Sequence, residues 1–124
     1  MKERKKLKNW LMNLKNFIIK NENTIIVVEG KRDKMALEKF EIGNVYSLKG
    51  MSFHNFSEMI AEKIKPDSVI LITDFDSEGE IIGKKLHAVM DKYNISVNTS
   101  FREALRETEI KFVEEIPKKL LRRK

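Results

Sequence analysis

Two short apolar runs, Thr24–Val28 and Val69–Thr73, are the strongest hydrophobic features of this chain. Each run is too short for a typical helix, is almost entirely apolar and is rich in β-branched residues. This pattern is typical of a strand that is buried on both faces of a parallel sheet. A shorter run, Val45–Leu48, and the alternation of Ile95 and Val97 with polar residues predict two further strands.

Helical periodicity occupies the segments between these runs. It predicts one helix that begins near Asp33, and others over residues 56–64, 77–92 and 101–107, whereas residues 109–116 follow no clear period. In the long helix we expect these buried positions: Ile81, Ile82, Leu86, Val89 and Met90. Strands that alternate with helical crossovers indicate an α/β fold with a parallel sheet.

An amphipathic helix is predicted before the first strand. Its apolar residues recur three and four positions apart, with lysines and asparagines on the other face: Leu7, Trp10, Leu11, Leu14, Phe17 and Ile18. We expect this stripe to pack on the body of the protein. Binding to a membrane surface or to a partner protein is the alternative.

Length and composition exclude several classes of site. The chain of 124 residues has room for one domain with one core. It contains no cysteine, and His54 and His87 stand alone, so we expect neither disulfides nor a zinc site. No apolar stretch approaches the roughly 20 residues of a membrane span and no signal-peptide pattern is visible, so we expect a cytoplasmic protein.

The net charge of +6 is distributed unevenly along the chain. Residues 1–20 carry seven basic side chains and one acid, residues 117–124 carry five basic side chains and no acid, and residues 21–116 carry 13 basic and 18 acidic side chains. An acidic body between two basic ends suits a cation site that is flanked by segments binding a polyanion. The alternative is that both ends are simply solvated.

Carboxylates follow both strong apolar runs. Glu29 follows the first run, and Asp74 and Asp76 follow the second on either side of Phe75. The carboxyl ends of parallel strands meet at one edge of a sheet, where open α/β folds bind ligands. Acids within a few ångströms of one another repel by roughly 1–4 kcal/mol per pair, so a bound cation would offset the cost. The sequence therefore predicts a magnesium site, because Mg²⁺ prefers hard oxygen ligands.

Helix capping is the competing interpretation of the second motif. Ser77 followed by Glu80 matches a capping box, and acids in a first turn suit the helix dipole. Capping does not explain why Asp74 ends a buried strand. We therefore retain Asp74 and Asp76 as metal ligands, with Glu78 as a further candidate and Glu80 as the weakest one.

Basic residues beside the predicted strand ends are candidates for phosphate binding. Lys31 and Arg32 follow Gly30, which allows close approach of a backbone or ligand, and Lys49 lies where the second strand should end. A solvated basic helix start is the alternative for Lys31 and Arg32.

The motifs Glu29-Gly30-Lys31 and Asp74-Phe75-Asp76-Ser77-Glu78-Gly79-Glu80, each after an apolar strand, resemble those of the Toprim family. Its members include type IA and type II topoisomerases, bacterial primases, recombination proteins and ribosomal-RNA maturation nucleases. The resemblance spans roughly Thr24 to Ser100. It implies a Rossmann-like domain whose four-stranded parallel core sheet is flanked by helices.

The same resemblance implies roles for the acids. Glu29 would be the general acid or base, and Glu29, Asp74 and Asp76 would hold one or two Mg²⁺ ions, with Asp74 as the natural bridge. Topoisomerases also carry a tyrosine nucleophile on a separate domain, and primases need partner domains. In 124 residues we expect neither, so we expect a layout nearest to that of the compact nuclease branch.

These observations lead to one division of the chain and one functional expectation. Residues 1–23 form a basic amphipathic helix, residues 24–100 the Toprim domain, and residues 101–124 a helical extension with a basic tail. We expect Mg²⁺-dependent phosphodiester hydrolysis on RNA or DNA, with Mn²⁺ as a possible substitute. The basic side chains expected to hold the strand near the C-terminus are Lys118, Lys119, Arg122, Arg123 and Lys124. The alternatives are a non-catalytic binding subunit, with a protein partner or a second copy, and a nucleotide-processing enzyme.

Overall fold

The structure is a computed structural model that describes residues 2–121. The predicted tail residues Arg122, Arg123 and Lys124 lie outside the described residues. No helix within the described range has the length and apolar character needed to cross a bilayer.

A four-stranded sheet with the order β2-β1-β3-β4 forms the centre of the fold. The strands are β1 (Thr24–Val28), β2 (Val45–Ser47), β3 (Ser68–Leu71) and β4 (Val97–Asn98), and every neighbouring pair is parallel. All five residues of β1 are buried, as expected for a strand covered on both faces. The predicted α/β fold with a parallel four-stranded sheet is confirmed.

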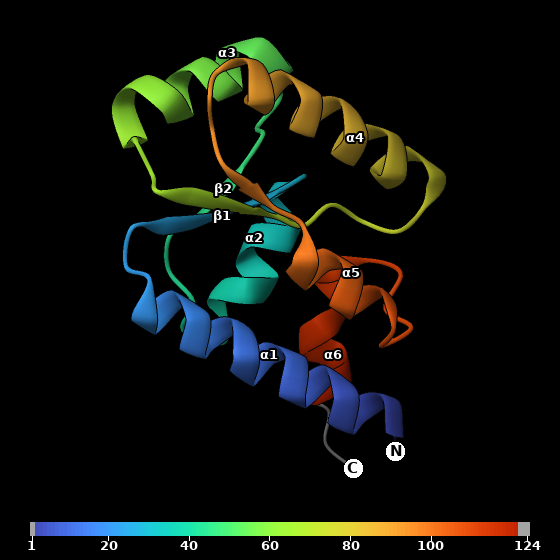
Figure 1. The fold of residues 1–124 in the computed structure, drawn as a ribbon. Helices are drawn as coiled ribbons and strands as arrows, with labels where there is room; N and C mark the ends of the chain where they lie inside the picture. The colour runs from blue at the N-terminus through green and yellow to red at the C-terminus, as the bar shows by residue number, and fades with distance from the viewer. Residues whose placement is uncertain (1, 122–124) are drawn as a thin grey trace.

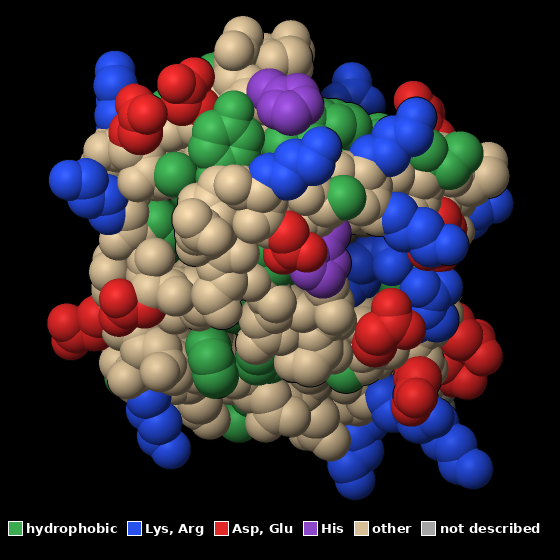
Figure 2. All heavy atoms as spheres, turned by 45° about the horizontal axis from the view of Figure 1, so that its top comes forward, with side chains coloured by type: hydrophobic (Ala, Val, Ile, Leu, Met, Phe, Trp, Pro, Cys, Tyr) green, Lys and Arg blue, Asp and Glu red, His purple; other side chains and the backbone are tan. Residues whose placement is uncertain are grey.

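Helices cover both faces of this sheet (Figure 1). Helices α3 (Phe53–Met59) and α4 (Ser77–Lys92) lie on one face, with the π-helical turn η1 (Ile60–Ile64) continuing α3. The other face is covered by four helices: α1 (Lys2–Lys20), α2 (Lys31–Glu38), α5 (Ser100–Arg106) and α6 (Ile116–Leu120). On the side of α3 and α4, basic and acidic side chains are interspersed over the surface (Figure 2).

Helix α1 packs its apolar stripe into the core. Leu7, Trp10, Leu11 and Leu14 are buried together with residues of β1 and β3. The indole Nε1–H of Trp10 donates to the backbone carbonyl of Phe101 at 2.8 Å, which ties α1 to α5. The predicted packing on the body is confirmed, and the alternative of a membrane or partner surface on this stripe is wrong because the stripe is already covered.

Two local expectations differ from the structure, and one segment that had no prediction takes a defined form. Helix α2 begins at Lys31 rather than near Asp33, because Gly30 is extended and serves as its N-cap. Ile81 was expected to be buried but is 53% exposed, because the buried face of α4 turns away from it. Residues 109–116, which had no clear period, form a turn followed by the 3₁₀ turn η2 (Val113–Glu115) and the start of α6.

Candidate metal centre

The first two predicted carboxylates meet at the carboxyl edge of the sheet. Strands β1 and β3 are hydrogen-bonded neighbours with Val27 opposite Leu71, so the segments that follow them emerge side by side. The Oε2 atom of Glu29 accepts a hydrogen bond from the backbone N–H of Asp74 at 2.7 Å. The interpretation of the sequence required the carboxylates of positions 29, 74 and 76 to meet in one pocket. The structure brings the Glu29 carboxylate against the backbone of Asp74, and joint metal binding by the three acids stays a prediction.

The C-terminal segment also contacts Asp74. Its Oδ1 atom accepts a hydrogen bond from the backbone N–H of Val113 at 2.8 Å. The backbone N–H of Phe75 donates to the carbonyl of Lys111 at 2.9 Å, so the two segments run against each other at the site. Residues 111–113 were not recognised as part of the site from the sequence, because no local pattern marks them.

Asp76 lies at the start of α4 and caps it. Its Oδ1 atom accepts a hydrogen bond from the N–H of Gly79 at 2.8 Å. The capping box expected at Ser77 and Glu80 is therefore wrong, because the cap is one residue earlier. Glu80 instead bonds two arginines of α5, Arg102 and Arg106, at 3.2 and 2.8 Å. The hydrogen bond from Arg106 is the main reason why the pKa of Glu80 falls to about 2.

Asp33 is an acidic member of the site that the sequence interpretation missed. It is buried in the first turn of α2, and its Oδ2 atom accepts a hydrogen bond from the N–H of Gly30 at 3.1 Å. This contact fixes the backbone immediately after Glu29. An acid three residues after an N-cap is half of a capping box, so the spacing of Gly30 and Asp33 could have identified it.

Burial and mutual repulsion both raise the pKa values of the acids at this site. Burial, followed by the charges of Asp33, Glu29 and Asp76, raises the pKa of Asp74 to about 7, against the opposing effect of the Val113 N–H. Burial also raises the pKa of Glu29, and the charges of Asp33, Asp76 and Glu78 act in the same direction. The site therefore disfavours its own full ionisation, which is the condition that a bound cation relieves.

The arrangement suits Mg²⁺ in one particular way. One oxygen each of Glu29, Asp74 and Asp76 is engaged by a backbone N–H, and their second oxygens make no hydrogen bond within residues 2–121. In the same range, no three acidic or histidine side chains converge closely enough to bind an ion together. Mg²⁺ usually retains several waters and binds through one or two carboxylates. The residues present fit that mode of binding and not a site in which all three carboxylates coordinate directly.

The predicted phosphate contacts lie on two segments, the start of α2 and the residues just beyond β2. Lys31 and Arg32 are exposed in the first turn of α2, and the N–H of Gly30 is used by Asp33. Lys49 is exposed just beyond β2, with a left-handed φ of 53°, and lines a separate hollow of about 320 Å³.

Arg102 is a second residue that the sequence interpretation missed. It is buried on α5, where its Nε–H donates to the carbonyl of Thr73 at 2.8 Å and its Nη2–H donates to the carbonyl of Asp74 at 2.6 Å. Its guanidinium also lies 4.5 Å from the centre of the Phe75 ring. Arg102 thereby fixes the backbone that carries the central acid. An arginine inside an amphipathic helix carries no sequence signal for this role.

Gly79 completes the support of the same loop. A Cβ atom at this position would overlap the backbone carbonyl of Asp74. The close approach of α4 to the 74–76 loop therefore requires glycine at the third position of the helix.

Comparisons with known proteins agree with this geometry. A sequence model of the Toprim domain matches residues 24–112, which extends past the expected end at residue 100 and includes Arg102 and Lys111. A solved structure of a protein from Aquifex aeolicus has a TM-score of 0.77 and 34% sequence identity, and the match covers 87% of this chain and 95% of that one.

Curated relatives point to the same family. A UPF0292 protein of Methanosarcina barkeri is 36% identical over 96 residues, which are 74% of this chain and 66% of that protein. The DNA primase DnaG of Methanocella arvoryzae is 37% identical over 71 residues, which are 57% of this chain and 14% of the primase. Since the family match covers most of the chain, including both acidic motifs, the protein belongs to the Toprim-domain family.

Proposed function

We propose that this protein carries out Mg²⁺-dependent phosphodiester chemistry on nucleic acid, most simply hydrolysis as in a nuclease. The observation that carries the proposal is the meeting of Glu29 and Asp74, joined by a 2.7 Å hydrogen bond among further acids. Toprim membership supports metal-dependent processing of nucleic acid in general, and one relative is named as a DNA primase.

Glu29 is the proposed general acid or base. Burial raises the pKa of its carboxyl above the ordinary value, which favours exchange of a proton with water or with a leaving oxygen. Its Oε2 atom is fixed by the Asp74 N–H, so the carboxylate has a defined orientation. These two features suit a group that transfers a proton at a fixed place.

Glu29, Asp74, Asp76 and Glu78 are the residues proposed to hold one or two Mg²⁺ ions, with one or two carboxylates on each ion directly and the others through its bound waters, and with Mn²⁺ able to substitute. The ion would supply positive charge that stabilises the phosphate oxygens during displacement. The chain's own contribution is to hold the acids in place through the amides of Asp74, Gly79 and Val113. Each amide fixes one oxygen of one carboxylate, so the three acids keep defined positions even though their charges repel.

Gly30, Lys31, Arg32 and Lys49 are the proposed contacts to the phosphate backbone. Gly30, Lys31 and Arg32 follow Glu29 directly in the chain, and Lys49 follows β2, which is the hydrogen-bonded neighbour of β1. Contacts to phosphate position a strand without reading its sequence, and they weaken as salt rises. We therefore expect little sequence preference and a steep dependence of binding on salt.

A cleavage assay with titrated Mg²⁺ and Mn²⁺ tests the proposal on single-stranded, duplex and structured RNA and DNA. Glu29→Gln keeps an oxygen that can accept from the Asp74 N–H but removes the proton-transferring carboxylate. We expect its rate to fall by about 10²–10⁴-fold. Glu62→Gln, at an exposed position on η1, is the matched control and should cleave normally. Cleavage at the wild-type rate by Asp74→Asn in the presence of Mg²⁺ would overturn the proposal.

A non-catalytic nucleic-acid-binding subunit is the second candidate. It is favoured by the absence, within residues 2–121, of three side chains that converge on one ion. This function predicts that wild-type protein binds nucleic acid, with a protein partner or a second copy, but shows no metal-dependent turnover on any of the substrates above.

A further inference from the structure

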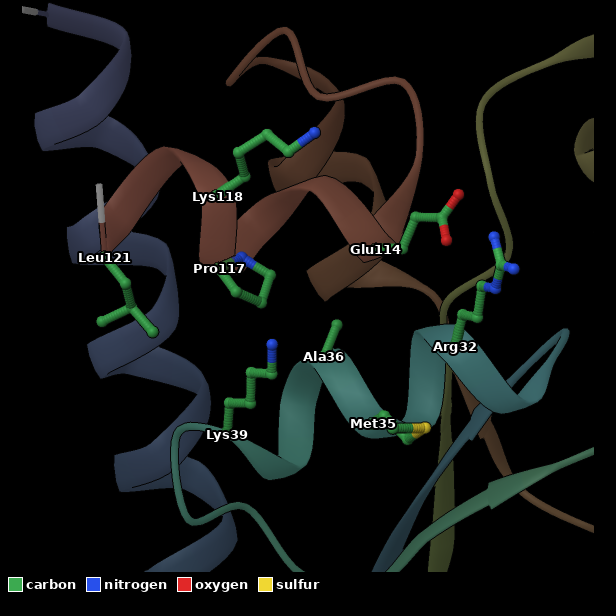
Figure 3. A pocket seen from close by; sticks show the side chains of 8 residues that line it. All are labelled: Arg32, Met35, Ala36, Lys39, Glu114, Pro117, Lys118 and Leu121. Carbon is green, nitrogen blue, oxygen red and sulfur yellow. The ribbon is translucent and has the colours of Figure 1, made fainter. Parts of the chain in front are cut away.

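A groove of about 520 Å³ runs between α2 and the segment formed by η2 and α6. Arg32 and Glu114 lie at one end, Lys39 and Leu121 lie toward the other, and Lys118 projects from the α6 wall (Figure 3). The sequence could not indicate this groove, because its two walls, residues 32–39 and 114–121, lie far apart in the chain and meet only through tertiary packing.

Positive charge predominates in this groove. Arg32, Lys39 and Lys118 line it, against one carboxylate, that of Glu114. No ion pair within residues 2–121 engages any of these three cations. Cations that converge on a hollow without internal partners favour an anionic occupant.

The groove begins beside the acidic site. Glu114 at its end lies near Asp33: burial is the main reason why the pKa of that carboxyl is raised, and the charge of Glu114 acts in the same direction. Asp33 in turn bonds the N–H of Gly30, directly after Glu29. A polyanion with one phosphate at the acids would therefore place its neighbouring units in this groove.

The floor of the groove is apolar. Ala36 and Pro117 face each other between its ends, and Met35 and Leu121 are 49% and 53% exposed. Apolar side chains can pack against the faces of unpaired bases, which a duplex keeps stacked inside. The volume also lies within the range of about 300–1,000 Å³ typical of sites for small ligands, so it suits a few nucleotides of one strand.

We propose that the groove between α2 and α6 binds single-stranded nucleic acid, with Arg32, Lys39 and Lys118 on the phosphates and Met35 and Leu121 against the bases. The part of this inference in which the strand runs from the groove to the acidic site rests on the proposed function. Its binding component is nevertheless measurable without any turnover.

The test is fluorescence anisotropy with a short labelled oligonucleotide, as RNA and as DNA, in EDTA so that no metal-dependent cleavage occurs. The double variant Lys39→Ala with Lys118→Ala should weaken single-strand binding by about tenfold near 0.1 M salt. It should also reduce the slope of log affinity against log salt by about 1.4, for two lost phosphate contacts on a single strand. Met35→Ala should weaken binding without changing the slope, because it carries no charge.

The matched control removes the same charge from the other face of the sheet. Lys85 and Lys92 are exposed on α4, where charges of both signs are interspersed (Figure 2). The double variant Lys85→Ala with Lys92→Ala should bind as the wild type does. A loss of affinity equal to that of the groove variant would show that only net charge matters, and would overturn the proposal.

Other outcomes separate the groove from the catalytic proposal. If the groove variant loses binding and the wild type shows no cleavage, the groove proposal is supported and the nuclease proposal is contradicted. Cleavage by wild type with unchanged single-strand affinity in the groove variant would support the nuclease and overturn the groove. Failure of the wild type to bind a single strand at about 100 µM, the weak limit of non-specific binding, would also overturn it. Altered self-association of the groove variant, with unchanged affinity for nucleic acid, would overturn the groove proposal too and would identify the groove as a protein-binding surface.

Discussion

Replacement of Asp74 by Asn should make the metal-free protein more stable while it removes function. The Asp74 carboxyl lies partly buried beside other acids, and burial is the largest cause of the rise in its pKa to about 7. Asparagine has nearly the same shape, and its Oδ1 atom can still accept the hydrogen bond from the Val113 N–H. The substitution therefore removes a repelled charge and keeps the contact.

The magnitude and the pH range follow from this pKa. A rise from 3.8 to about 7, at about 1.36 kcal/mol per pKa unit, sets a ceiling of about 4 kcal/mol on the cost of ionising Asp74 in the fold. The group is partly solvated, so screening reduces this to roughly 1–2 kcal/mol. Because the folded pKa is the higher one, the protonated carboxyl stabilises the fold below about pH 4. That contribution is lost as the pH rises through about 7.

Denaturant unfolding followed by circular dichroism, in EDTA, measures the effect. Near pH 8 the Asn variant should exceed the wild type by roughly 1–2 kcal/mol in free energy of unfolding, and near pH 4 the two should coincide. Saturating Mg²⁺ should stabilise the wild type more than the variant, because a ligand stabilises the state that binds it. Asp67→Asn, at an exposed position, is the control and should change neither value. An Asn variant that is less stable than the wild type near pH 8 without metal would refute the picture of a strained acidic site.

Three further substitutions test how the loop around the central acid is held. Arg102→Met should cost about 2–4 kcal/mol in denaturant unfolding, because it leaves two backbone carbonyls without their donor, and Arg102→Lys should restore only part of the loss. Gly79→Ala should destabilise the protein by about 1–3 kcal/mol, because the added Cβ overlaps the Asp74 carbonyl. Gly43→Ala, with open space around it, is the control and should not destabilise. Equal melting temperatures of the two variants would contradict the overlap. Asp76→Ala should lose about 1 kcal/mol as its cap is removed, and Asp76→Asn should not, since Asn caps equally well; an unchanged Ala variant would argue against the cap.

The sheet and the central acids could be predicted because their signals are local. A few consecutive apolar residues, as in Thr24–Val28, are enough to identify a buried parallel strand. The residue after such a strand must lie at the carboxyl edge of the sheet. The positions of Glu29 and Asp74 follow from these two facts and from the adjacency of β1 and β3. The amphipathic stripe of α1 likewise predicted its own burial, because a stripe of that width is stable only when covered.

The supports of the site could not be predicted, because they depend on tertiary packing. Arg102 acts on the 73–74 backbone only because α5 lies against the end of β3, and nothing near it in the sequence records that contact. The amide of Val113 donates to the carboxylate of Asp74, which lies 39 positions earlier in the chain. Asp33 is the exception, since its spacing from Gly30 is a local capping signal that could have been read.

The C-terminal segment therefore has a more specific part in the site than a basic tail would have. Residues beyond position 100 supply the Arg102 guanidinium to two loop carbonyls, the Lys111 carbonyl to the Phe75 N–H, and the Val113 N–H to the Asp74 carboxylate. The Val113 amide opposes the rise in the pKa of Asp74, because it places partly positive charge next to the carboxylate, whereas Arg102 fixes the backbone that carries it. The same segment continues directly into the wall of the groove at Glu114 and Lys118. Occupation of that groove would thus bear on the position of the Val113 amide and, through it, on the acid at the centre of the proposed chemistry.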